Sequence, residues 1–140
     1  MNNCVTKFGP LFGRVLIGIV YLANGIGLSV SLREVVTMMV GRGIPAPMPL
    51  LSLVILVWLT GSVCVIVGWR FRLAASVLFL LTIPVLVGIH GPWNADAASF
   101  QNELNHFLKG IAMLGGLVYL AAFGPGEFHL GHNRRHSQTE

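Results

Sequence analysis

The sequence has few charged side chains. Only 10% of its 140 residues are Asp, Glu, Lys or Arg, whereas 54% are hydrophobic. Soluble domains carry about 25% charged residues, so this chain has too few to cover the surface of a soluble globule. No polar segment is long enough to form a soluble catalytic domain. The composition therefore excludes a dinucleotide-binding or P-loop domain.

Cysteine is also scarce. Cys4 and Cys64 are the two cysteines, and they form no C-x-x-C motif, so we expect no dithiol relay within this chain. We interpret Cys64 as a small apolar packing residue. The first apolar stretch continues without an A-x-A cleavage site, so we interpret it as a retained span rather than a signal peptide.

Four long stretches contain no charged residue at all: residues 15–32, 43–69, 73–95 and 110–126. A bilayer core of about 30 Å needs about 20 helical residues at about 1.5 Å each. The sequence therefore predicts an all-α, polytopic membrane protein, an antiparallel bundle of four transmembrane helices. The net charge of +4 would favour nucleic acid in a soluble chain. Here the basic residues flank the spans, so we expect contact with the lipid bilayer and no nucleic acid.

Local signals set the expected boundaries. The first span covers residues 11–32, with Pro10 in its first turn, and residues 33–40 form a short interfacial helix after it. A proline-rich connector, residues 44–49, leads into a second span over 50–68, because prolines remove donors and disfavour regular helix. The third span covers 73–89, with Pro84 expected to kink it. The fourth begins within 99–109 and ends at 124–126, where Gly-Pro-Gly stops a helix.

The distribution of Lys and Arg predicts the orientation. Six basic residues fall on one side, namely Lys7, Arg14, Arg70, Arg72, Arg134 and Arg135, against Arg33, Arg42 and Lys109 on the other. Basic residues concentrate in the cytoplasm, so we expect both termini there and the loop between the third and fourth spans outside. We expect small residues to form the helix contacts: Gly18, Ala23, Gly25, Gly27, Gly61, Gly68, Ala112 and Gly116.

Polar residues gather at the extracytoplasmic ends of the third and fourth spans: His90, Trp93, Asp96, Glu103, His106 and Lys109. Such residues are costly near the membrane and need partners or a purpose. Hydrogen-bond donors, a titratable group and an aromatic wall suit a quinone, so His90, Trp93, Glu103, His106 and Lys109 are the candidates for substrate or quinone binding. The alternative is structural, with helix-end hydrogen bonds and Trp93 in an aromatic belt. Zinc or iron would suit the two imidazoles and one carboxylate, but no ligand motif supports a metal, and none is assigned.

Other polar residues have simpler interpretations. Asn24, within the first span, is expected to hydrogen-bond across helices. Arg14, Arg70 and Arg72 are expected to be topology and lipid anchors. Residues 127–140 are expected to form a flexible, basic, lipid-facing cytoplasmic tail, in which His129, His132 and His136 could bind a metal.

Taken in order, several short motifs resemble those of the DoxX family of small four-helix bacterial membrane proteins. They are Asn24-Gly25-Ile26-Gly27, Gly43-Ile44-Pro45-Ala46-Pro47, Gly68-Trp69-Arg70-Phe71-Arg72-Leu73-Ala74-Ala75, His90-Gly91-Pro92-Trp93, Phe107-Leu108-Lys109-Gly110, Gly115-Gly116 and Gly124-Pro125-Gly126. The resemblance implies one four-helix domain over residues 1–126. The chain departs from the family pattern at Leu28, Trp58 and Gly110, where relatives often have Lys, Glu and Asn.

The resemblance also implies a function. The family is linked to membrane oxidoreductases, including a quinone-reducing thiosulfate-oxidising complex, and to oxidative-stress assemblies with soluble thiol-handling partners. We therefore expect a small subunit or accessory of a redox system in the bacterial inner membrane, linked to quinone or to thiol and sulfur chemistry. Without a dithiol or flavin domain it would need a redox partner for catalysis, and it could form a homo-oligomer. The alternative is a non-enzymatic transport, permeability or assembly module.

Overall fold

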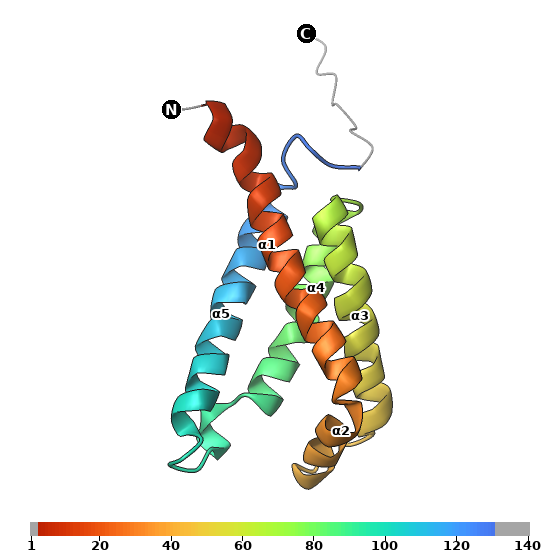
Figure 1. Ribbon diagram of the computed structural model, residues 1–140, viewed down its shortest axis with the longest axis vertical. Helices are drawn as coiled ribbons and strands as arrows, with labels where there is room; N and C mark the ends of the chain where they lie inside the picture. Colours follow the sequence, from red (N-terminus) through yellow and green to blue (C-terminus); the bar gives the residue numbers. More distant parts are fainter. Residues whose placement is uncertain (1–2, 131–140) are drawn as a thin grey trace.

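The computed structural model describes residues 3–130, and this part of the chain is helical without a strand (Figure 1). The helices are α1 (Asn3–Val30), α2 (Leu32–Gly41), α3 (Pro47–Val67), α4 (Phe71–Ile89) and α5 (Phe100–Phe123), with a 3₁₀ turn, η1 (Pro92–Asn94), before α5. Four of them, α1, α3, α4 and α5, are long and apolar enough to span a membrane. The predicted all-α, multi-pass membrane fold is confirmed.

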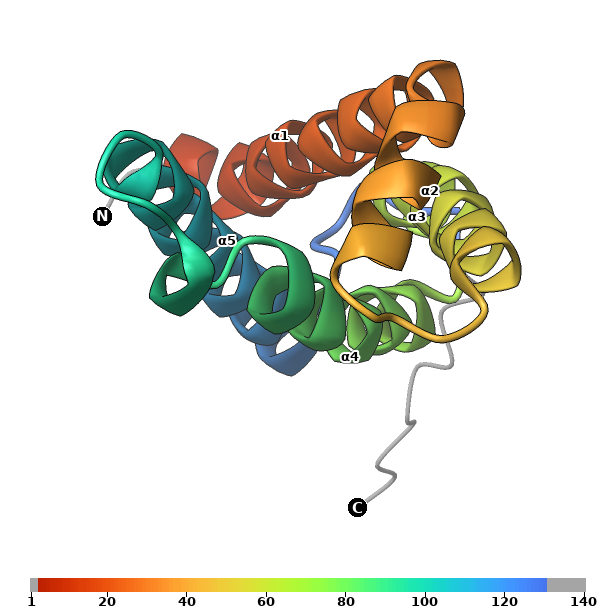
Figure 2. The same ribbon diagram turned by 90° about the horizontal axis from the view of Figure 1, so that it is seen from below.

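The four long helices form an antiparallel bundle. α1 packs mainly against α3, and α4 packs against both α3 and α5. The two ends of the described chain lie together at one end of the bundle, and α2 lies at the opposite end (Figure 1). We call these the terminal end and the α2 end. Viewed from the α2 end, α2 lies beside α3 (Figure 2). The C-terminal end of α1 and the N-terminal end of α5, which both lie at the α2 end, are far apart in this view.

Glycines allow close approach at several helix contacts. Gly18 faces Ile66 and the Ser62 carbonyl, Gly25 faces Leu59, Gly61 faces Leu78, and Gly116 faces Ile17. These four predicted contacts are therefore present, because a side chain at any of them would meet the neighbouring helix. Within residues 3–130 the predicted contacts of three other residues are not formed: Ala23 and Ala112 are exposed, and nothing lies near the open face of Gly27.

A small polar group lies inside the apolar core. The Tyr21 and Thr82 side chains are buried, and their oxygens are 3.0 Å apart. Since the Thr82 hydroxyl donates to the Leu78 carbonyl at 2.6 Å, the Tyr21 hydroxyl donates to Thr82. Trp58, 8% exposed, meets the Tyr21 ring edge-on. This hydrogen-bonded chain ties α1 to α4 and satisfies hydroxyl groups that would be costly in an apolar interior.

Three helices begin earlier than predicted. α1 begins at Asn3, so that Pro10 lies inside it, because a proline removes only one donor and membrane helices tolerate the loss. α3 begins at Pro47, because its prolines occupy the first turn, where backbone N–H groups have no intrahelical acceptor. α4 begins at Phe71. The interfacial helix α2 and the end of α5 at Gly124 agree with the sequence-based prediction.

Arg14 is not a lipid anchor. Its side chain is only 3% exposed, and its guanidinium donates to the Pro125 carbonyl at 2.9 Å and to the Phe128 carbonyl. The Leu130 N–H group donates to the Val67 carbonyl at 3.2 Å. Arg14 therefore holds the segment after α5 across the terminal end, because carbonyls beyond a helix end accept hydrogen bonds that no helix partner uses.

We call this segment, residues 124–130, the C-terminal strap. The strap includes the first residues of the predicted basic tail and folds back onto the bundle. Lys7 lies 3.8 Å from Glu127, and the Phe8 ring stacks on the Phe128 ring. The rest of the predicted tail, including His132 and His136, lies outside the described residues.

Candidate functional site

The candidate site lies where α4 ends and α5 begins, at the α2 end. α4 stops at Ile89, His90 is its C-cap residue, and the chain turns through η1 before α5 starts at Phe100. This short connection returns the chain beside α4 and brings Glu103, in the first turn of α5, against His90. The structure therefore assembles part of the polar group predicted from the sequence.

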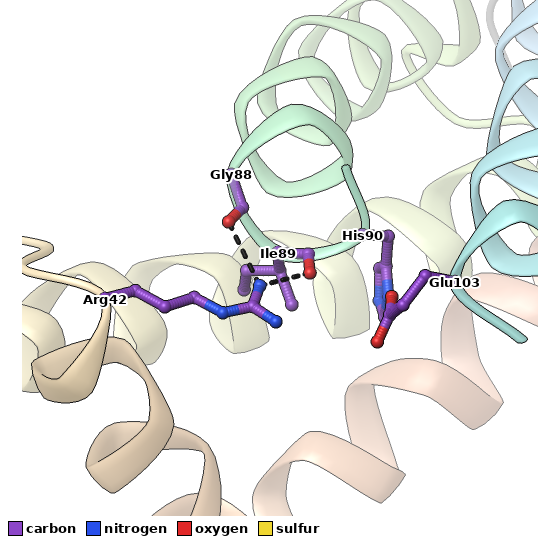
Figure 3. Close-up of polar contacts among 5 residues, drawn as sticks. All are labelled: Arg42, Gly88, Ile89, His90 and Glu103. Carbon is purple, nitrogen blue, oxygen red and sulfur yellow. Dashed lines mark hydrogen bonds and ion pairs between the residues drawn. The ribbon is translucent and has the colours of Figure 1, made fainter. Parts of the chain in front are cut away.

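His90 and Glu103 form the centre of the site (Figure 3). The His90 Nδ1 atom lies 3.1 Å from Glu103 Oε2, and the two side chains are 36% and 22% exposed. The carboxylate stands at a helix N-terminus and the imidazole at a helix C-terminus, where the helix dipoles favour a negative and a positive charge respectively. The pair thus joins the C-terminal end of α4 to the N-terminal end of α5.

His106 extends the pair toward the surface. Its ring stacks on the His90 ring, with centroids 5.0 Å apart and planes at 19°, and His106 is exposed. Glu103, His90 and His106 therefore form a continuous group of titratable side chains that reaches from the α4–α5 contact to the outside of the bundle. Proton transfer requires hydrogen-bond contact, which the His90–Glu103 pair makes, whereas the His90 and His106 rings are stacked.

Arg42 approaches the same place from the turn after α2. Its guanidinium donates to the Gly88 carbonyl at 3.2 Å and to the Ile89 carbonyl (Figure 3). These carbonyls have no partner inside the helix because α4 ends there. Sequence analysis missed Arg42 at this site, and no local signal could have found it, since the contact joins segments far apart in the chain.

The aromatic wall is made by Trp93. Its indole lies over Gly91 and meets the Phe107 ring edge-on at 5.5 Å, yet 58% of the residue remains exposed. Any side chain at position 91 would collide with the indole. The buried glycine therefore lets Trp93 lie flat against the η1 turn and close to α5.

Two polar residues named in the sequence analysis, Lys109 and Asn24, lie apart from the His90–Glu103 pair. Lys109 is exposed, and its side chain has no polar partner in the described chain. Asn24 is also exposed, and the expected hydrogen bond across helices is not formed within residues 3–130. Its position on the outer surface of α1 explains the difference.

Asp96 stabilises the turn before α5. Its Oδ1 atom accepts hydrogen bonds from the Ser99 N–H group at 2.8 Å and the Ser99 hydroxyl at 2.6 Å. These bonds stabilise the carboxylate and hold the pKa of Asp96 below its ordinary value of 3.8. Asp96 therefore orders the turn that starts α5 and does not join the His90–Glu103 pair.

Within residues 3–130 no three His, Cys, Asp or Glu side chains come together in a way that could hold a metal ion. A shallow hollow at the α1–α2 corner is lined by residues 29–34 and includes none of the candidate residues.

Comparison with known proteins identifies a family for this chain. The DoxX family model matches residues 9–91. No curated protein and no solved structure matches the chain. The match ends just beyond His90, so it includes the α4 half of the candidate site, while Glu103, His106 and Lys109 on α5 lie beyond it.

Proposed function

Because the chain belongs to the DoxX family of membrane proteins, we propose that it is a small accessory subunit of a bacterial inner-membrane redox system. In this proposal both termini are cytoplasmic, and the α2 end, on the outer side, binds the head group of a quinone. The observation that carries the proposal is the contact of Glu103 with His90 and of His90 with His106.

A quinone takes up protons together with electrons when it is reduced. A site for it needs side chains that hold and release protons at the edge of the hydrocarbon region. The His90–Glu103 pair meets this need because it shares one polar contact between an imidazole and a carboxylate. His106, stacked on His90 and exposed, connects the pair to the surface of α5.

Binding also needs donors and a flat wall. Lys109 lies one turn beyond His106 on the same side of α5, so both can donate to carbonyl oxygens. Trp93, exposed and braced by Phe107, offers a flat surface beside them. These residue types fit a quinone head, whose oxygens accept hydrogen bonds and whose ring is planar.

The electrons would come from a partner, a redox or thiol-handling protein. Cys4 and Cys64 are free thiols on α1 and α3, and neither belongs to a C-x-x-C motif. The role proposed for this chain is therefore to bind and orient the quinone and to move protons, while the partner supplies electrons.

The test is mass spectrometry of small molecules that co-purify with the protein. We expect a quinone with the wild type and much less with His106→Ala or Lys109→Ala. Lys7→Ala, which removes an exposed lysine at the terminal end, is the matched control and should retain the quinone. Lipid alone in every sample would contradict the proposal and favour the transport, permeability or assembly alternative, which a flux assay in liposomes would examine.

A further inference from the structure

α1 and α5 meet at one place and then separate. Ile17 of α1 contacts α5 at Gly116. From there toward the α2 end the two helices diverge, as both views show (Figures 1 and 2). We call the diverging part the α1–α5 seam. It faces the bilayer in a chain whose long helices are candidate membrane spans.

Helix periodicity places one polar residue on each side of this seam. Asn24 follows Ile17 by seven residues, and Lys109 precedes Gly116 by seven. Seven residues are about two turns, so each returns to within about 20° of the direction of the contact residue. Because the helices are antiparallel, both residues lie about 10 Å from the contact, on the side of the α2 end.

Both residues lie well inside their helices. Asn24 is about 9 Å before the end of α1 and Lys109 about 14 Å after the start of α5, at about 1.5 Å per residue. Both are exposed, and in the described part of the chain neither side chain has a hydrogen-bond or ionic partner. An amide and an ammonium on this surface would face lipid, where unpaired polar groups are costly. The placement therefore calls for a ligand with hydrogen-bond acceptors.

A hydrocarbon-tailed quinone satisfies these conditions. Its carbonyl oxygens accept hydrogen bonds from the Asn24 amide and the Lys109 ammonium, while its tail remains in the bilayer outside the seam. His106, one turn from Lys109 on α5, leads from the seam to His90. We propose that the quinone head enters sideways through the α1–α5 seam and that Asn24 is a binding residue together with Lys109. This inference rests on the proposed function and adds the route and the α1 side of the site.

The experiment measures binding of decylubiquinone to the full chain in phosphatidylcholine nanodiscs. Asn24→Leu keeps the size of the side chain and removes one neutral hydrogen bond, so the Kd should rise roughly fivefold. Lys109→Met removes a charge-assisted hydrogen bond, and the Kd should rise roughly thirtyfold. Ser76→Ala, on the exposed surface of α4, is the control and should bind like the wild type. Circular dichroism and the elution profile of each variant check its fold.

The outcomes separate this inference from the proposed function. Wild-type affinity in Asn24→Leu together with weak binding in His106→Ala would overturn the seam and leave quinone binding in place. No binding to the wild type would overturn both. If Asn24→Leu leaves affinity unchanged and alters the oligomeric mass in native mass spectrometry, Asn24 is a contact between copies and the inference is wrong. Loss of a co-purified phospholipid rather than of decylubiquinone would likewise overturn it.

Discussion

The His90 Nδ1 atom lies 3.1 Å from Oε2 of Glu103, and this contact fastens the end of α4 to the first turn of α5. It is a structural link as well as the centre of the candidate site. Arg42 binds the last carbonyls of α4 beside it. The α2 turn, α4 and α5 therefore meet at one point, and changes to either member of the pair can be tested for both roles.

Glu103→Gln should loosen the link between α4 and α5. The glutamine keeps the size of the side chain and removes the negative charge that faces the His90 ring. We expect faster hydrogen exchange of the backbone between residues 90 and 103, measured by mass spectrometry at neutral pH. Glu127→Gln, at the exposed ion pair with Lys7, is the control for loss of one carboxylate. If the backbone of residues 90–103 exchanges equally fast in both variants, the His90–Glu103 pair has no structural role.

Arg14→Met should release the C-terminal strap. The variant leaves the Pro125 and Phe128 carbonyls without their donor, and we expect a loss of about 2 kcal/mol in the free energy of unfolding. The Leu130 amide, which donates to the Val67 carbonyl, should exchange faster. Thermal unfolding in detergent and hydrogen exchange measure the two effects. Arg70→Met, at an exposed arginine over the Trp69 ring, should change neither.

Gly68→Ala should destabilise the terminal end. Gly68 has φ +80°, and a Cβ atom there would lie 2.6 Å from the His129 Cβ and 2.7 Å from the Arg14 Nη1. The left-handed conformation alone costs about 1 kcal/mol for alanine, and the collision adds to it. Gly88→Ala is the matched control, since Gly88 lies in α4 with open space around it. The unfolding temperature of Gly88→Ala should stay the same or rise. If Gly68→Ala unfolds at the same temperature as the wild type, the strap is not packed as described.

Tyr21→Phe should cost about 1 kcal/mol, the usual worth of one hydrogen bond. The variant keeps the buried ring against Trp58 and removes only the hydroxyl that donates to Thr82. Thr82 retains its bond to the Leu78 carbonyl, so no new unpaired donor arises there. Tyr119→Phe, on the exposed surface of α5, provides the comparison in the same thermal unfolding assay, and a loss of the same size there would contradict a specific core bond.

Asp96→Ala should weaken the start of α5 in a pH-dependent manner. Because the Ser99 hydrogen bonds lower the pKa of Asp96 in the folded protein, the ionised carboxylate stabilises the fold above the ordinary pKa of 3.8. That contribution is lost as the pH falls through the lowered folded pKa. The difference between wild type and variant should therefore be full at neutral pH and shrink in acid. Hydrogen exchange of Ser99 and Phe100 at matched pH measures it, and a difference that does not vary with pH would contradict this assignment.

The sequence by itself determined the four spans, the interfacial helix and the Gly124 stop. These features depend on local properties, namely runs of apolar residues longer than the bilayer core and glycines or prolines at their ends. The starts of α1 and α3 were misplaced because a proline signals the beginning of a helix as readily as it occurs within one in a membrane. Neither meaning can be read from the residue alone.

Only the tertiary structure decided the partners of the polar side chains. Arg14 was expected at the lipid surface and is buried under the C-terminal strap, whereas Asn24 was expected between helices and is exposed. The sequence correctly predicted that His90, Glu103 and His106 lie close together, because all three are near one short turn. It could not reveal Arg42 beside them or the divergence of α1 from α5. Such contacts depend on the rotation and tilt of helices that are far apart in the chain, and no local pattern encodes these.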